Sequence, residues 1–154
     1  MAAVKDIMSR KVHTIGCDEP LSAAAQKMAE CGIRHIVVVN QDGAPQGVFS
    51  ERDVLRYLVR SLNNPSQRPK DAIADELTAR QMISIKPDTL IVEAAATMAE
   101  KRIGCLPVMD NEKLVGIVTT IDILNHKADD KPAKEHVAGE KAESEIAATS
   151  ESSS

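Results

Sequence analysis

A short motif that occurs twice constrains the fold of this chain more than any other feature. Gly47–Asp53, of sequence GVFSERD, returns in the second half as Gly116–Asp122, of sequence GIVTTID. Each copy carries a glycine, a hydroxyl residue and a carboxylate at the same spacing, with an apolar run before the hydroxyl and helical spacing after the carboxylate. The chain therefore contains two copies of one strand-to-helix unit.

The repetition covers most of the chain. Thr14-Ile15 corresponds to Ser84-Ile85, and the helical and strand residues that follow correspond in the same order. Each copy is predicted to be β-α-β-β-α, and a unit of this size cannot bury its sheet alone. We therefore predict an α/β (α+β) fold in which two repeats, residues 1–62 and 74–126, pack sheet to sheet with pseudo-twofold symmetry, joined by a proline-containing linker, residues 63–73.

The first repeat carries signals for where its elements begin and end. Asp18 is expected to be the N-cap of a helix that has Pro20 in its first turn, and Gly32 is expected to end that helix. The run Ile36-Val37-Val38-Val39 is continuous and β-branched, which is typical of a buried strand.

The composition argues against nucleic acid as a partner. The chain has one Phe, one Tyr and no Trp, so the core must be aliphatic and no aromatic platform is available for stacking bases. The net charge of −4 arises mostly in the tail, residues 127–154, which is rich in Lys, Glu, Ala and Ser and is predicted to be disordered. The folded part is nearly neutral, so attraction of polyanions such as nucleic acid is not expected.

The cysteines and the apolar runs bear on where the protein resides. Cys17, Cys31 and Cys105 form neither a Cys-x-x-Cys pair nor a zinc-ligand spacing, and the N-terminus does not resemble a signal peptide. A cytoplasmic location is therefore expected. Charged residues interrupt every apolar run before it reaches the roughly 18 residues of a membrane span, so no membrane is expected as a partner.

The Ser50-x-x-Asp53 and Thr119-x-x-Asp122 patterns have two interpretations. In the first they are capping boxes, with Asp in place of the usual Glu, and each satisfies two N–H donors of a helix. In the second the helix N-terminus attracts a phosphate or another anion, while the carboxylate accepts ribose hydroxyls. Taken alone, the pattern favours capping.

The order and spacing of the motifs resemble a known family. Gly32–Val39, Gly47–Asp53 and their second copies, with Leu106–Asp110 and Leu114–Val118 closest to the pattern, resemble a tandem pair of cystathionine-β-synthase (CBS) domains, also called a Bateman module. The resemblance spans roughly residues 4–125. It implies a regulatory module with two clefts between the repeats, in which such proteins often bind AMP, ADP, ATP or S-adenosylmethionine.

The resemblance also implies roles for individual positions. In the family, carboxylates at the positions of Asp53 and Asp122 bind ribose hydroxyls. Hydroxyl groups at the positions of Ser50 and Thr119 contact phosphate or polar ligand atoms. The positions that Arg34 and Arg52 occupy in the first repeat lie near the phosphates. Backbone groups of the first strand of each repeat meet the edge of the adenine. The implied ligand-binding residues are Thr14, Ile15, Arg34, Ser50, Arg52, Asp53, Ser84, Ile85, Thr119, Ile121 and Asp122.

The chain departs from the family pattern at a few positions. Val37 stands where the family often has proline, as the second repeat does at Pro107. Gly104 and Ile121 remove positive charge from the second set of phosphate positions. We therefore expect two unequal clefts, with the tighter one built around the first motif.

Other functions have weaker support in the sequence. The histidines, cysteines and carboxylates form no pattern of nucleophile, base and orienting group, so we predict no catalytic residue and no enzyme. One alternative is an interaction module whose clefts are vestigial. Another is a metal or redox responder that uses His35 and Cys105, which occupy equivalent positions in the two repeats.

The expected ligand and partners follow from the regulatory interpretation. We predict no metal and no cofactor apart from the adenine nucleotide as a regulatory ligand. The expected protein partners are a second copy in a twofold homodimer and an effector that the sequence does not name.

Overall fold

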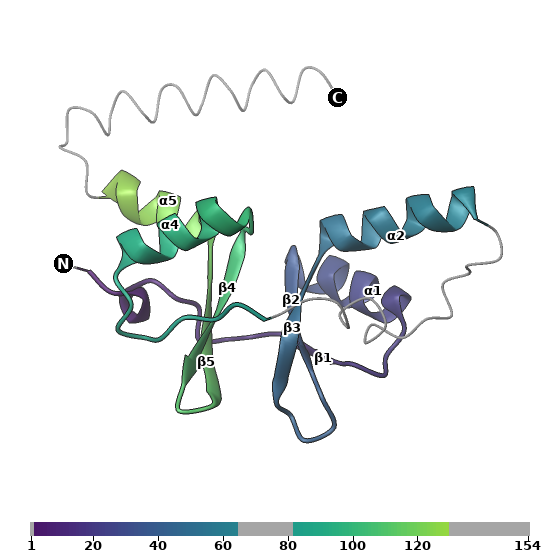
Figure 1. Cartoon of the computed structure of the whole chain (residues 1–154), viewed down its shortest axis with the longest axis horizontal. Helices are drawn as coiled ribbons and strands as arrows, with labels where there is room; N and C mark the ends of the chain where they lie inside the picture. The colour runs from purple at the N-terminus through teal and green to yellow at the C-terminus, as the bar shows by residue number, and fades with distance from the viewer. Residues whose placement is uncertain (1, 65–81, 130–154) are drawn as a thin grey trace, which may run out of the picture.

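The computed structural model describes residues 2–64 and 82–129, so the predicted linker from residue 65 and the predicted tail from residue 130 lie outside the described residues. The fold is mixed α/β with two small sheets (Figure 1). The elements follow in the order η1 (Val4–Asp6), β1 (Thr14–Gly16), α1 (Leu21–Cys31), β2 (His35–Val39), β3 (Pro45–Ser50), α2 (Glu51–Asn63), α4 (Ile91–Lys101), β4 (Cys105–Asp110), β5 (Lys113–Thr119) and α5 (Thr120–Asp129).

The two sheets have corresponding pairing. In the first, β1 runs parallel to β2 and β2 runs antiparallel to β3. In the second, β4 runs antiparallel to β5, and Ile85 forms a parallel bridge to Val108 at the place that β1 takes in the first sheet. The sheets lie side by side in the middle of the molecule, with α1 and α2 beyond one sheet and α4 and α5 beyond the other (Figure 1). The predicted α/β fold class with two repeats is confirmed.

Each repeat has its own core of buried side chains. Apart from Phe49 and Tyr57 in the first, both cores are aliphatic, as the composition predicts. The first core contains Ile15, Leu21, Ala24, Met28, Ile36, Val38, Phe49 and Tyr57, and the second contains Val4, Ile91, Ala94, Met98, Leu106, Val108, Val118 and Ile123. Contacts between β3 and β4 join the two halves.

The ends of the helices partly follow the sequence signals. Gly32 ends α1 in the left-handed conformation with φ 65°, as predicted. The N-cap of α1 is Pro20 and not Asp18, because Pro20 has an extended backbone with ψ 157° and the helix begins only at Leu21. In the second repeat α5 continues to Asp129, so the first residues of the predicted tail are helical.

The N-terminal segment, residues 2–9, crosses to the second repeat. The Val4 side chain is fully buried in the second core, and its N–H donates to the Thr89 carbonyl at 2.8 Å. Ser9 and Ile117 of β5 exchange two backbone hydrogen bonds of 2.9 Å. Gly116 permits this approach, since a Cβ there would lie 2.5 Å from Met8 Sδ. The sequence division places this segment in the first repeat, whereas its packing contacts are with the second.

Within residues 2–64 and 82–129, no helix combines the length and the apolar character that crossing a bilayer requires.

The burial of Val4 makes a testable prediction about the N-terminal segment. Val4→Ala should lower the free energy of unfolding by about 2 kcal/mol, because it removes fully buried methyl groups from the second core. Val92→Ala is the matched control, since Val92 is 58% exposed on α4. Urea denaturation of both variants checks the prediction, and equal midpoints would show that the segment does not stabilise the second repeat.

Candidate functional site

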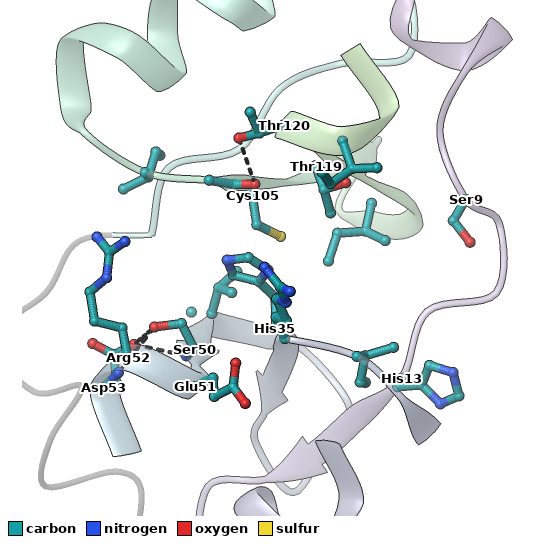
Figure 2. Close-up of a pocket in the computed structure, with 18 of the residues that line it drawn as sticks. Ser9, His13, His35, Ser50, Glu51, Arg52, Asp53, Cys105, Thr119 and Thr120 are labelled. Atoms are coloured by element: carbon teal, nitrogen blue, oxygen red, sulfur yellow. Dashed lines mark hydrogen bonds between the residues drawn. The ribbon is translucent and has the colours of Figure 1, made fainter. Parts of the chain in front are cut away.

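Residues of both repeats and of the N-terminal segment line a single cavity of about 1430 Å³ (Figure 2). It contains both copies of the repeated motif, at the ends of β3 and β5 where α2 and α5 begin. The resemblance implies two clefts, whereas here both motifs face one continuous space.

The first motif is a complete capping box at the start of α2. The Asp53 N–H donates to Ser50 Oγ at 3.1 Å, and the Ser50 N–H donates to Asp53 Oδ2 at 2.8 Å. Ser50 Oγ also donates to Asp53 Oδ2 at 2.8 Å. Asp53 is 9% exposed, so a buried carboxylate is held by these hydrogen bonds at the positive end of a helix.

The second motif repeats this geometry at the start of α5. Asp122 Oδ2 accepts from the Thr119 N–H at 2.8 Å and from Thr119 Oγ1 at 3.1 Å. The Asp122 N–H donates to Thr119 Oγ1 at 3.4 Å. Both patterns therefore do cap helices, and they do so with carboxylates that also line the cavity.

In each repeat a further backbone hydrogen bond connects the motif to the residue just before the neighbouring strand, β2 in the first repeat and β4 in the second. The Glu51 N–H donates to the Arg34 carbonyl at 2.9 Å, and the Thr120 N–H donates to the Gly104 carbonyl at 3.0 Å. This bond brings residue 34 or 104 beside the helix N-terminus in each repeat. The local folding of each repeat thus places the two positions together.

The structure brings seven of the eleven predicted site residues to the cavity. These are Arg34, Ser50, Arg52, Asp53, Thr119, Ile121 and Asp122. The other four do not line it: Ile15 belongs to the first core, Ile85 packs against the second core, and Thr14 and Ser84 precede them. Their neighbours His13 and Ile83 do line the cavity.

The sequence interpretation did not include several charged residues of the cavity. Lys11 lies between the N-terminal segment and β1, Arg56 lies on α2, and Arg102 lies at the end of α4. Arg56 follows Arg52 by one helical turn, and this spacing could have indicated it. No sequence pattern near Lys11 indicates that it lines the cavity, because its position depends on how the N-terminal segment crosses to the second repeat.

His35 and Cys105 lie in the middle of the cavity, between the two motifs (Figure 2). Burial is the largest cause that holds the pKa of His35 below its ordinary value of 6.5, Arg34 and Arg52 add to it, and Asp53 opposes it. Burial, with a smaller contribution from Asp122, raises the pKa of the Cys105 thiol to about 12. At neutral pH this cavity therefore contains a neutral imidazole and a protonated thiol.

The same two residues were the candidates for a metal site. Within the described parts of the chain, no group of three or more His, Cys, Asp or Glu side chains is arranged to hold a metal ion. A protonated thiol is also a poor ligand, because metals bind the thiolate.

Comparison with known proteins identifies the family. The CBS domain model matches residues 4–60 and 74–129, once for each repeat. The chain belongs to the CBS domain family and contains a tandem pair of these domains.

Several relatives are similar over most of this chain. An uncharacterised protein of Methanopyrus kandleri is 36% identical over 79% of this chain, and the match spans 61% of that relative's own length. Hypoxic response protein 1 of Mycobacterium tuberculosis is 33% identical over 82% of this chain and 85% of its own length.

Solved structures of CBS domain pairs share the fold. The CBS domain pair of protein MJ0100, in complex with 5′-methylthioadenosine and S-adenosyl-L-methionine, is 27% identical with a TM-score of 0.71, over 84% of this chain and 98% of its own. A hypoxic response protein I structure with two coordinated zinc ions is 31% identical with a TM-score of 0.67, over 81% and 98%.

The lowered pKa of His35 predicts how stability depends on pH. Below about pH 6.5 the unfolded chain takes up a proton that folded His35 does not, so the free energy of unfolding should fall as the pH falls. His35→Gln should flatten this decline. Thermal unfolding of the wild type and this variant between about pH 7.5 and 5.5 measures the difference. Parallel curves for the wild type and His35→Gln would contradict the assignment.

Proposed function

We propose that this protein is a non-catalytic regulatory module that binds an adenine nucleotide or a related adenosyl ligand between its CBS domains. Pairs of these domains are generally regulatory rather than catalytic. The observation that carries the proposal is the presence of two hydroxyl–carboxylate motifs, each at a helix N-terminus, on one cavity that also holds several arginines.

The chemistry of the lining suits a nucleotide. A carboxylate accepts hydrogen bonds from ribose hydroxyls, and the capping bonds of Asp122 use only its Oδ2 atom. Arginine beside a helix N-terminus suits phosphate, because the charge of the guanidinium and the positive end of the helix dipole both favour an anion. Arg34 and Arg52 supply these cations in the first repeat. The ligands of the MJ0100 domain pair, 5′-methylthioadenosine and S-adenosyl-L-methionine, support an adenosyl ligand here.

We expect backbone groups to contact the adenine, rather than aromatic side chains that stack on it. The described residues that line the cavity include no Phe, Tyr or Trp, whereas apolar residues such as Ile83, Ile103 and Ile117 are present. The backbone around Thr14-Ile15 and Ser84-Ile85 remains our candidate for the adenine edge, and it is supported by His13 and Ile83 next to those positions.

Signalling would follow from the position of the cavity. Its walls come from both repeats and from the N-terminal segment, so a ligand that contacts them all favours one relative arrangement of the repeats. An effector protein would then respond to that arrangement. Three free cysteines without a disulfide are consistent with the reducing cytoplasm that we propose as its location.

A metal or redox responder is the second candidate function. The pairing of His35 with Cys105 in one cavity favours it, together with the zinc ions in the similar hypoxic response protein I structure. The raised pKa of Cys105 opposes it at neutral pH. Metal analysis of the purified protein tests the metal form of this candidate, since that form requires bound metal and the nucleotide sensor does not.

The nucleotide proposal predicts separable effects of three substitutions. Arg52→Ala should weaken AMP binding by about tenfold or more by removing a charge-assisted hydrogen bond, and should affect adenosine far less. Asp53→Ala should weaken both ligands, because it removes the ribose acceptor of the first motif. Asp122→Ala should spare the tighter site. Calorimetric titration of AMP and adenosine into the four proteins measures these differences.

The two aspartate variants control for each other, because each loses a similar capping box. Their thermal stability should therefore fall by comparable amounts while their affinities differ. Equal losses of affinity from both, or no loss from either, would end the assignment of a tighter first site. An interaction module with vestigial clefts would bind neither ligand.

We also propose that two copies form a twofold homodimer through exposed apolar side chains. On α2 these are Leu55, Leu58, Val59 and Leu62, and on α5 they are Ile121 and Leu124. Leu55 and Leu124 occupy equivalent positions in the two repeats, so a twofold contact can bury both helix faces at once.

The dimer proposal is tested at Leu62, which is 83% exposed. Leu62→Glu should shift the protein toward monomer, because it places a charge in the apolar contact. Gln41→Glu adds the same charge in the exposed turn between β2 and β3 and should leave the dimer intact. Multi-angle light scattering at tens of micromolar measures the mass, and a wild type that is only monomeric would refute the proposal.

A further inference from the structure

Arg102 has a backbone conformation that disfavours an arginine. It is the C-cap of α4, with φ 54° and ψ 46° in the left-handed region. The equivalent residue of the first repeat is Gly32, which ends α1 with φ 65° and ψ 34°. Glycine adopts this conformation without steric cost, whereas a residue with a Cβ is strained there. Such strain is found most often where the side chain has a function.

Arg102 is one of the residues that line the cavity. Gly32 in the first repeat corresponds to Arg102 in the second. Two residues later the exchange is the other way round, because the first repeat has Arg34 and the second has Gly104. A Cβ on Gly104 would lie 3.5 Å from Thr120 Oγ1 and 3.6 Å from His35 Nε2, so a longer side chain there would have to share its space with the imidazole. Each repeat thus supplies one arginine from this turn, and the second repeat supplies it from the strained position.

The charges around the cavity favour a ligand with several negative groups. Five cationic side chains face three carboxylates, although the whole chain has a net charge of −4. Arg102 forms no ion pair with any of the residues that the structure describes. Its guanidinium is therefore available to an anion that enters the cavity. The charged lining residues are Lys11, Arg34, Arg52, Arg56 and Arg102, with Glu51, Asp53 and Asp122.

We propose that Arg102 is a specificity-determining residue that binds the terminal phosphates of a nucleotide, so that the cavity prefers ATP or ADP to AMP. The inference rests on the proposed function and deepens it. The first motif, with Arg34 and Arg52, holds the ribose and the nearest phosphate, and Arg102 reaches the phosphate chain from the other repeat. A ligand with such a chain contacts both repeats, whereas adenosine does not engage Arg102.

A structural role for Arg102 makes different predictions. A cation at the C-terminus of a helix stabilises it through the helix dipole, without any ligand. In that case substitution should lower thermal stability and leave nucleotide affinity unchanged. The two roles are separated by measuring both quantities on the same variants.

The experiment titrates ATP, AMP and adenosine calorimetrically into the wild type, Arg102→Gly and Arg102→Lys. Arg102→Gly gives the turn the residue that the first repeat has, so the fold is expected to be retained. ATP affinity should fall about tenfold or more, AMP affinity less, and adenosine affinity should not change. Arg102→Lys should keep part of the ATP affinity. Lys101→Ala is the control, because it removes one charge from the neighbouring exposed residue, which does not line the cavity.

Each contrary outcome is distinct. If the wild type prefers nucleotides but Arg102→Gly binds ATP as tightly, the inference is wrong and the proposed function stands. If Arg102→Gly lowers the affinity for all three ligands equally, Arg102 maintains the shape of the cavity and does not bind phosphate. If Lys101→Ala causes the same loss of ATP affinity, the loss reflects the overall charge of the protein and not a phosphate site at Arg102. A wild type that binds none of the three ligands overturns the proposed function together with the inference.

Discussion

The reciprocal hydrogen bonds between a hydroxyl and a carboxylate at the start of α2 and α5 are the interaction on which the rest of the structure depends. They fix where each strand stops and each helix begins, and so they set the direction in which each helix leaves its sheet. The same bonds hold Asp53 and Asp122 at the cavity with defined orientations. Capping therefore does not by itself exclude ligand binding at this motif, since the capping bonds of Asp122 use only its Oδ2 atom.

The two repeats share some core residues and differ at some positions that line the cavity. Met28 and Met98 occupy equivalent core positions, and each buries the same face of its helix against the sheet of its repeat. Around the cavity, Arg34 is matched by Gly104 and His35 by Cys105. A packed core constrains both copies equally, whereas a cavity that accepts one asymmetric ligand favours different side chains on its two sides. The exchanges of Arg34 for Gly104 and of His35 for Cys105 make the two sides of the cavity chemically different.

Sequence patterns predicted the features that depend on local chemistry. The repeat, the two sheets, the left-handed stop at Gly32 and the capping boxes all follow from residue types at fixed spacing. Features that depend on contacts between distant segments were not predictable in this way. Nothing near Val4 indicates that it is buried against α4, and nothing near Lys11 indicates a cavity. The predicted N-cap at Asp18 was wrong for a local reason, because the backbone of Pro20 is extended and the helix begins only at Leu21.

The path of the N-terminal segment links the cavity to the arrangement of the repeats. Residues 2–9 pack on the second repeat, Lys11 and His13 then pass along the cavity, and β1 joins the sheet of the first repeat. A covalent connection between the two halves therefore forms part of the cavity wall. Any change in the distance between the repeats must be accommodated by this short stretch, since Ser9 and Thr14 are hydrogen-bonded into opposite sheets. A ligand that contacts this stretch acts on the element whose geometry limits how far the two repeats can move apart.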